Sequence, residues 1–264
     1  MPKIKVRDIN IYYEIHGDGY PLVMIMGFTG TANFWSPFLI DGVSKHFKTI
    51  IFDNRGAGRT DKPDIDYTIA MMADDTAGLM DALKIERAHV LGISMGGMIA
   101  QEFVLNHPEK VNKLILVATH CGGYRSIFPP VEITDFLAGK TTNTPEEWIE
   151  KEMSFLYPEE FIKNNPDYIE ERKQVYLKTS LPDKSRERNI LAAGRFNAGR
   201  RLKKINTPTL VIHGKKDLLM PYQNAEILAN NISCAKLILF DNIGHDLFSP
   251  EPEKVNKALI QFLK

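Results

Sequence analysis

A serine between two glycines is the strongest chemical signal in this sequence. The segment 92–96 runs Gly-Ile-Ser-Met-Gly, directly after a short apolar run and directly before a helical pattern. This Gly-x-Ser-x-Gly spacing is typical of a sharp strand-to-helix turn that exposes the serine hydroxyl, with glycines where Cβ atoms would clash. A serine hydroxyl becomes a nucleophile when a base removes its proton. Ser94 is therefore the candidate nucleophile, and a turn without chemistry is the alternative.

Among the seven histidines, His245 is the candidate base. It lies in the segment 241–246, Asp-Asn-Ile-Gly-His-Asp, immediately after the last short apolar run. A loop at that place can carry an imidazole to the serine, because ligands bind at the carboxyl ends of the strands in sheets of this type. His213 ends an earlier apolar run, and we interpret it as a packed side chain.

An imidazole base needs a carboxylate that fixes its tautomer and stabilises the imidazolium. Asp217 follows the apolar run 209–213 by a few residues, which places it at the same edge as Ser94 and His245. The chain order serine, aspartate, histidine is then one that catalytic triads are known to have in an α/β fold. Asp241 and Asp246 are rivals that lie close to His245 in the sequence, but neighbours along the chain rarely have the needed geometry. We expect Asp217 to be the acid.

These residues need a scaffold, and the apolar pattern predicts a mostly parallel sheet. Short apolar runs without alternation are typical of strands that are buried on both faces. They occupy residues 22–26, 49–52, 89–92, 113–118, 209–213 and 236–240. Residues 3–6 and 10–15 predict an antiparallel hairpin at the sheet edge. Helical patterns lie between the runs, at residues 66–83, 95–106 and from 252 onward, so we expect a doubly wound α/β fold.

One segment interrupts the alternation of strands and helices. Between residues 122 and 200 the sequence shows no buried strand, and several helical stretches begin at Pro or Thr-Pro. A segment of this length is too long for a loop. We therefore expect two units: a core domain made of residues 1–121 and 201–264, and a helical insertion made of residues 122–200.

Composition excludes several other classes of protein. Lys plus Arg and Asp plus Glu are equal at 33 each, so no overall charge attracts the chain to nucleic acid. The two cysteines lie far apart and outside any metal-binding pattern. The N-terminal residues lack the apolar core of a signal peptide, and no apolar run approaches the roughly 20 residues that span a membrane. We expect a cytoplasmic protein that binds neither nucleic acid nor membrane.

With these motifs the chain resembles the α/β-hydrolase superfamily over nearly its whole length, with residues 122–200 placed like the helical cap of that family. The resemblance implies an oxyanion hole formed by the backbone N–H groups of Phe28 and Met95. Most members have His-Gly where this chain has Met26-Gly27, so the hydrogen bonds that support this turn are expected to differ. The segment 53–59, Asp-Asn-Arg-Gly-Ala-Gly-Arg, matches a family loop that is mainly structural.

Within the superfamily, the chain resembles small capped esterases and lactonases, including 3-oxoadipate enol-lactonase and acyl-homoserine-lactone hydrolases. We therefore expect hydrolysis of carboxylic esters or lactones with small to medium acyl groups, without a metal or cofactor, by a monomer or homodimer. Cofactor-free haloperoxidases and carbon–carbon bond hydrolases share the triad and stay open as alternatives. A non-catalytic receptor or scaffold is a more remote one. Trp35 and Trp148 are the expected pocket aromatics.

Overall fold

A twisted sheet of eight strands forms the centre of the molecule in the computed structural model, which describes residues 2–28, 30–141, 144–179 and 182–264. The strand order is β1-β2-β4-β3-β5-β6-β7-β8. The strands are β1 (Lys3–Val6), β2 (Ile9–His16), β3 (Tyr20–Ile25), β4 (Phe47–Phe52), β5 (Ala88–Ile93), β6 (Val111–Val117), β7 (Thr209–Gly214) and β8 (Ala235–Phe240). Each expected apolar run forms one of these strands.

The pairing of the strands agrees with the expected topology. β1 and β2 form an antiparallel hairpin at one edge of the sheet, and β2 pairs antiparallel with β4. All pairs from β4 to β8 are parallel. Since the carboxyl ends of these strands meet at one edge, the loops that follow β3, β5 and β7 come together there. The fold class predicted from the sequence is confirmed.

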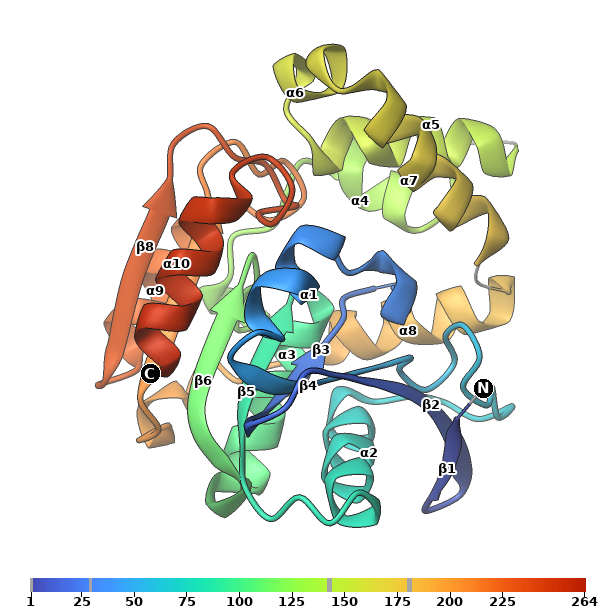
Figure 1. Cartoon of the computed structure of the whole chain (residues 1–264). Helices are drawn as coiled ribbons and strands as arrows, with labels where there is room; N and C mark the ends of the chain where they lie inside the picture. The colour runs from blue at the N-terminus through green and yellow to red at the C-terminus, as the bar shows by residue number, and fades with distance from the viewer. Residues whose placement is uncertain (1, 29, 142–143, 180–181) are drawn as a thin grey trace.

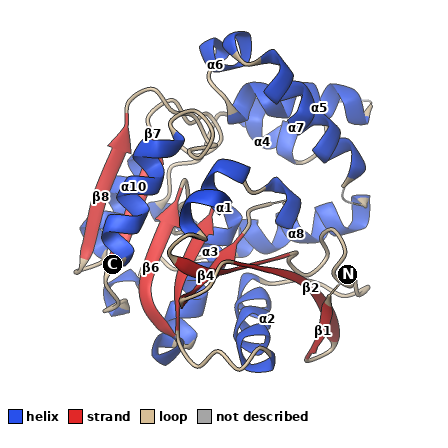
Figure 2. Cartoon of the chain, viewed as in Figure 1, coloured by secondary structure: helices blue, strands red, loops and turns tan. Residues whose placement is uncertain are grey.

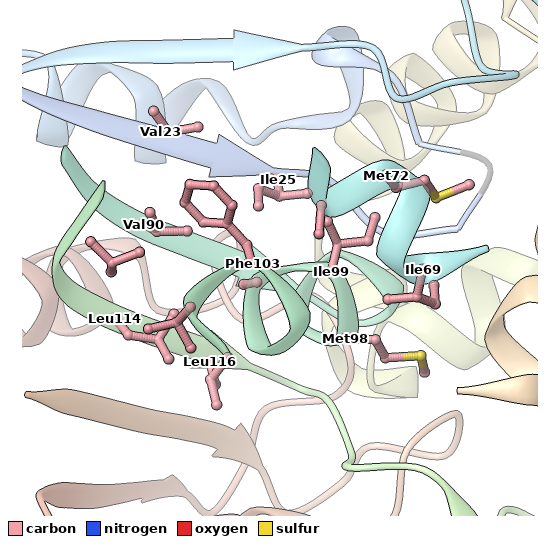
Figure 3. Packing of buried hydrophobic residues seen from close by; sticks show 14 of the residues in the cluster. Val23, Ile25, Ile69, Met72, Val90, Met98, Ile99, Phe103, Leu114 and Leu116 are labelled. Carbon is pink, nitrogen blue, oxygen red and sulfur yellow. The ribbon is translucent and has the colours of Figure 1, made fainter. Parts of the chain in front are cut away.

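Helices cover both faces of the sheet (Figures 1 and 2). On one face lie α2 (Ile69–Ala82), α3 (Met95–Asn106) and α9 (Gln223–Asn231), and on the other lie α1 (Pro37–Val43) and α10 (Pro252–Leu263). Figure 3 shows how Ile99 and Phe103 of α3 pack with Val23, Val90 and Leu114 of the sheet. Apolar residues on both sides of the strands explain why the strand sequences do not alternate.

A layer of helices lies above the carboxyl end of the sheet (Figure 1). It consists of α4 (Val131–Leu137), α5 (Pro145–Leu156), α6 (Glu159–Asn164) and α7 (Pro166–Lys178). Helix α8 (Asp183–Arg195) lies lower in Figure 1, and its Ala192 belongs to the same buried cluster as residues of α2 and α3. Helix α5 begins as its sequence indicates, with the Thr144 side chain accepting a hydrogen bond from the Glu147 N–H at 3.1 Å and Pro145 in the first turn. Helix α4 had no clear signal in the sequence. We call residues 122–200 the cap.

The two segments that connect the cap to the sheet domain lie side by side. Gly122 and Asn197 form an isolated antiparallel bridge, and the Ala198 N–H donates to the Cys121 carbonyl at 2.7 Å. Most of the cap helices pack on a cluster of their own, which includes Phe136, Trp148 and Met153. Among the helices that the structure describes, none is long and apolar enough to cross a membrane.

Candidate active site

Ser94 occupies a strained turn between β5 and α3. Its φ of 55° and ψ of −124° are a conformation that L-residues rarely adopt. The flanking glycines permit it, because a Cβ on Gly92 would lie 2.2 Å from the Gly96 carbonyl oxygen and one on Gly96 would lie 2.1 Å from that of Ile25. The Ser94 N–H donates to the Val117 carbonyl at 2.9 Å, so the neighbouring strand β6 holds the turn. The local geometry is that of a nucleophile elbow.

His245 and Asp217 form a buried pair on the neighbouring loops. His245 Nδ1 lies 2.8 Å from Asp217 Oδ2, and both side chains are buried. The other carboxylate oxygen, Oδ1, accepts hydrogen bonds from the backbone N–H groups of Leu219 and Met220, each at 2.9 Å. The loop after β7 therefore fixes the carboxylate, and the carboxylate fixes the imidazole ring.

The environment of Asp217 keeps it ionised. Burial by itself raises the pKa of the Asp217 carboxyl, but the charge of His245 and the hydrogen bonds from His213 and His245 outweigh it and lower that pKa to about 2. Because the ionised carboxylate accepts from His245 Nδ1, the proton of a neutral imidazole resides on Nδ1. Nε2 is then the nitrogen that can accept a proton.

The two rival aspartates are engaged elsewhere. Asp241 is exposed and forms an ion pair with Lys215 at 2.7 Å. Asp246 Oδ2 accepts hydrogen bonds from the Tyr157 hydroxyl at 2.7 Å and the Ser249 hydroxyl at 2.8 Å. Tyr157 belongs to the cap, so Asp246 connects the cap to the loop that carries His245. Over the described residues, the structure brings Asp217 to the His245 ring.

The expected oxyanion turn lies directly beside Ser94. A Cβ on Gly27 would lie 3.0 Å from the Ser94 Cβ and 3.5 Å from its Oγ, so the backbone here passes close to the serine. Phe28 and Met95 both line the same cavity as Ser94. The Met26 carbonyl accepts a hydrogen bond from the Asn54 side chain at 2.8 Å. In this chain a buried amide therefore holds the turn, where the sequence has methionine in place of the usual histidine.

The loop at residues 53–59 supports the turn through charge and hydrogen bonds. Asp53 accepts hydrogen bonds from the Ala32 N–H at 2.7 Å and from the Arg59 N–H and side chain at 2.7 to 3.0 Å. Arg55 is fully buried and forms two hydrogen bonds to each of Asp75 and Asp8. These contacts are structural, as the resemblance implied.

His213 makes a contact that sequence reasoning missed. Its Nε2 lies 2.9 Å from Asp217 Oδ2 and 2.8 Å from the Met220 carbonyl oxygen. Both atoms are acceptors, so Nε2 carries the proton and donates it. His213 thus supports the Oδ2 oxygen of the carboxylate, whereas the loop N–H groups bind Oδ1. A histidine that ends the strand just before the acid's loop is the only sequence signal, and it does not distinguish packing from hydrogen bonding.

A cavity of about 330 Å³ lies between the sheet edge and the cap. Ser94 and His245 line it from below, together with Phe28, Met95, Met98 and His120, and cap residues such as Leu137, Glu152, Leu156, Arg172 and Tyr176 close it from above. Such a cavity is large enough for a small ligand. Within the described ranges, no group of three or more His, Cys, Asp or Glu side chains could hold a metal ion.

The two expected pocket aromatics do not belong to the cavity wall that the described residues form, which corrects the sequence prediction. Trp35 is buried in the core and packs near Phe248, with ring centroids 5.8 Å apart. Trp148 stacks on Phe136 inside the cap, with centroids 5.2 Å apart and planes inclined by 15°. Residue type indicated burial correctly, but it could not indicate which surface each ring would cover.

His120 is a further polar residue on the cavity wall. Its Nδ1 accepts a hydrogen bond from the Gly122 N–H at 3.0 Å, which leaves the ring proton on Nε2. Burial lowers the pKa of His120 to about 4, so the ring is neutral near pH 7. It can offer a hydrogen bond to a ligand but carries no charge there.

Comparison with known proteins identifies a family for the chain. Residues 20–252 match the family model of the alpha/beta hydrolase fold. A protein of Azorhizobium caulinodans named "Putative carbamate hydrolase RutD" is 31% identical, over 99% of this chain and 98% of its own. An enol-lactonase from Burkholderia xenovorans LB400 has a similar structure, with a TM-score of 0.88 and 23% identity over 99% of each chain. An esterase from Exiguobacterium antarcticum has a TM-score of 0.85 and 25% identity over 99% and 98% of the two chains.

The chain belongs to the alpha/beta hydrolase fold family. The matched residues run from β3 to the beginning of α10. Membership in this family, together with relatives that are hydrolases, identifies the chain as a hydrolase.

Proposed function

We propose that this hydrolase cleaves carboxylic esters or lactones through an acyl-enzyme, with Ser94 as nucleophile, His245 as base and Asp217 as the residue that orients the base. One observation carries the proposal: His245 is held by Asp217 at 2.8 Å and lines the same cavity as Ser94. Ser94 itself lies in a turn with a positive φ of 55°, and such strained residues cluster at active sites.

The proposed reaction has two stages, acylation of Ser94 and deacylation, and His245 transfers protons in both. His245 Nε2 accepts the Ser94 proton as the hydroxyl oxygen attacks the substrate carbonyl, and Asp217 stabilises the imidazolium that forms. His245 then gives that proton to the leaving alcohol oxygen. In deacylation, His245 Nε2 accepts a proton from a water molecule whose oxygen attacks the acyl carbonyl. His245 then gives that proton to Ser94 Oγ as the bond between Oγ and the acyl group breaks, so the acid product is released and free Ser94 is regenerated.

The oxyanion of each tetrahedral intermediate would rest on the backbone N–H groups of Phe28 and Met95. Met95 is the first residue of α3, so its N–H has no acceptor within the helix and adds to the partial positive charge of the helix N-terminus. Donors of this kind stabilise the charge that develops in the transition state. The Asn54 bond to Met26 would keep Phe28 in place.

A carbamate is a second candidate for the substrate. The named relative from Azorhizobium caulinodans is 31% identical over nearly the whole chain, and a carbamate ester carries a carbonyl that a serine can attack in the same way. Ring-opening of a lactone and cleavage of a carbamate need the same nucleophile, base and oxyanion donors. The two substrates differ in the shape of the groups beside the carbonyl, which the cap side of the cavity would have to accommodate.

A substrate panel tests this proposal. We expect p-nitrophenyl esters, aliphatic lactones and p-nitrophenyl carbamates to be hydrolysed at different rates, with the esters or the lactones hydrolysed fastest.

We expect Ser94→Ala to lower kcat by about 10³-fold or more on each of these substrates, because the members of such a triad act as a unit. Ser154→Ala, which changes an exposed serine of the cap, is the matched control and should keep wild-type rates. A folded Ser94→Ala protein that keeps a tenth of the activity would refute the proposal. Faster cleavage of a vinylogous diketone than of any ester would favour carbon–carbon bond hydrolysis.

A further inference from the structure

Glu152 is a charged residue type at a core position of the cap. Helix α5 buries one face, and the apolar residues on it are Trp148, Ile149, Met153 and Leu156. Glu152 lies in the middle of this face and is only 7% exposed. Glutamate is almost never buried to this extent unless it is paired. The side chain therefore needs an explanation beyond packing.

The carboxyl group has an unused hydrogen-bonding atom. Glu152 Oε2 is buried and has no hydrogen-bond partner among the residues that the structure describes. Burial raises the pKa of Glu152 well above its usual range, and the opposing effect of Arg186 is smaller. Burial thereby favours the protonated carboxyl, which has one O–H donor as well as acceptor oxygens.

Glu152 also lines the cavity that contains Ser94. Helix α5 ends close to the loop that carries His245. The Leu156 carbonyl, at the end of this helix, accepts a hydrogen bond at 3.1 Å from the N–H of Asp246, the residue after His245. Glu152 lies four residues earlier, which is about 6 Å along a helix axis. A substrate atom a few bonds away from the scissile carbonyl could reach it.

We propose that Glu152 is a substrate-binding residue that donates a hydrogen bond to an uncharged carbonyl oxygen in the acyl part of the substrate. The structure thus points to esters or lactones with a keto or amide group several atoms from the scissile carbonyl, in preference to plain hydrocarbon chains. This inference rests on the proposed ester or lactone hydrolysis.

A neutral ligand group fits the charges around the cavity better than a cation does. Arg172 lines the same cavity, is only 5% exposed, and donates to the backbone carbonyls of Phe34 at 2.6 Å and Asn33 at 3.4 Å. No carboxylate of the described chain lies within ion-pair distance of its guanidinium. An ammonium group on the substrate would meet this positive charge, whereas a carbonyl group would not be repelled.

Matched esters provide the test. The substrates are p-nitrophenyl heptanoate and its 5-oxo and 6-oxo derivatives, which differ from it by a single ketone, and p-nitrophenyl 6-aminohexanoate as the cationic probe. For the wild type we expect kcat/KM to be about tenfold higher for at least one oxo ester than for heptanoate. A tenfold preference is the effect of one modest hydrogen bond.

The variants assign the preference to one side chain. Glu152→Gln keeps a donor of similar size and should retain the preference, whereas Glu152→Leu should reduce the ratio to about one or below. Glu146→Leu replaces an exposed glutamate of the same helix and should leave the ratio unchanged. Tyr176→Phe removes another hydroxyl from the cavity wall and should also leave it unchanged. Glu152→Met replaces Glu152→Leu if the latter does not fold.

Several results would overturn the proposal. Equal kcat/KM values for the oxo esters and heptanoate in the wild type would do so. So would an oxo-ester preference that survives in Glu152→Leu or that is lost in Tyr176→Phe. A preference for the amino ester would mean that Glu152 is ionised and would also contradict the proposal.

A second readout does not need turnover. The infrared carbonyl stretch of bound heptan-2-one should shift to lower frequency in the wild type and in Glu152→Gln, but not in Glu152→Leu. If ester hydrolysis persists in Ser94→Ala, the proposed function fails while this shift still tests Glu152. If hydrolysis depends on Ser94 but no oxo preference and no shift are seen, the Glu152 inference alone fails.

Discussion

The two walls of the cavity hold their side chains in different ways. On the sheet side, Ser94, Asp217 and the turn at Gly27 are fixed by backbone geometry and by hydrogen bonds from neighbouring loops. On the cap side, most wall residues are apolar or aromatic, and Glu152 Oε2 has no hydrogen-bond partner among the residues that the structure describes. We therefore expect the sheet side to tolerate fewer substitutions than the cap side.

Two hydrogen bonds and a stacked pair of rings connect the cap side of the cavity to the sheet side. The Tyr157 hydroxyl donates to Asp246, and Tyr168 and Ser249 share a hydrogen bond at 2.6 Å. Tyr176 stacks on Phe34 with ring centroids 3.9 Å apart. These contacts place the cap over Ser94 without involving Ser94 itself. Substitutions on the sheet side should therefore affect kcat, and substitutions on the cap side should affect which substrate is preferred.

The largest expected effect is on the sheet side, at Asp217. Asp217→Asn should lower kcat on the order of 10³- to 10⁴-fold, because an amide stabilises neither the required tautomer of His245 nor its imidazolium form. Steady-state kinetics on a p-nitrophenyl ester measures this. Asp241→Asn and Asp246→Asn should cost much less, since both carboxylates are engaged elsewhere. If Asp246→Asn is the more damaging of the three changes, the assignment of the acid is wrong.

A smaller effect is expected at His213, which contacts Asp217 without touching the cavity. The folded protein holds the pKa of Asp217 at about 2, below the ordinary value of about 3.9. The ionised form therefore stabilises the fold at pH values above about 4, and this contribution is lost as the pH falls through about 2.

Removal of the His213 bond should raise the pKa of Asp217. His213→Leu should accordingly lose stability at a higher pH than the wild type does, and kcat should fall about tenfold. Thermal melting between about pH 5 and pH 2 measures the shift. A variant with reduced kcat but an unchanged pH dependence of Tm would show that His213 has a packing role only.

The smallest effect is expected on the cap side. Leu137→Ala enlarges the upper part of the cavity, and each additional methylene that becomes buried should gain about 0.8 kcal/mol. The preferred acyl chain should then become longer by about one or two carbons, while kcat on the best substrate changes little. Leu191→Ala, which changes an exposed cap leucine, is the control. An unchanged length profile in a folded Leu137→Ala protein would place selectivity on the sheet side instead.

The same contrast explains what the sequence could predict. The strands, the elbow and the position of Asp217 depend on local patterns, such as apolar runs, glycine spacing and chain order, and the structure has the fold that these patterns predict. The pocket depends on which face of the cap covers which part of the sheet, and no local pattern contains that information. Trp35 and Trp148 were misplaced for this reason.

The roles of two polar residues, Glu152 and His213, differ in how far the sequence indicates them. Glu152 stands at helical spacing among Trp148, Ile149 and Leu156, so a glutamate on an apolar face was visible in the sequence. His213 gave no such signal, because its role depends on the path of the loop from Gly214 to Met220. Only the structure shows that this loop brings Asp217 back to the end of β7.

The most direct test of the account is covalent labelling of the nucleophile. A fluorophosphonate ester reacts with a serine that an adjacent base activates, and it mimics the tetrahedral intermediate. We predict that it attaches once, that mass spectrometry finds it on the peptide that contains Ser94, and that activity declines in proportion to labelling. Ser94→Ala should remain unlabelled. Full labelling at another residue, or a fully labelled Ser94 in a protein that still hydrolyses esters, would contradict the account.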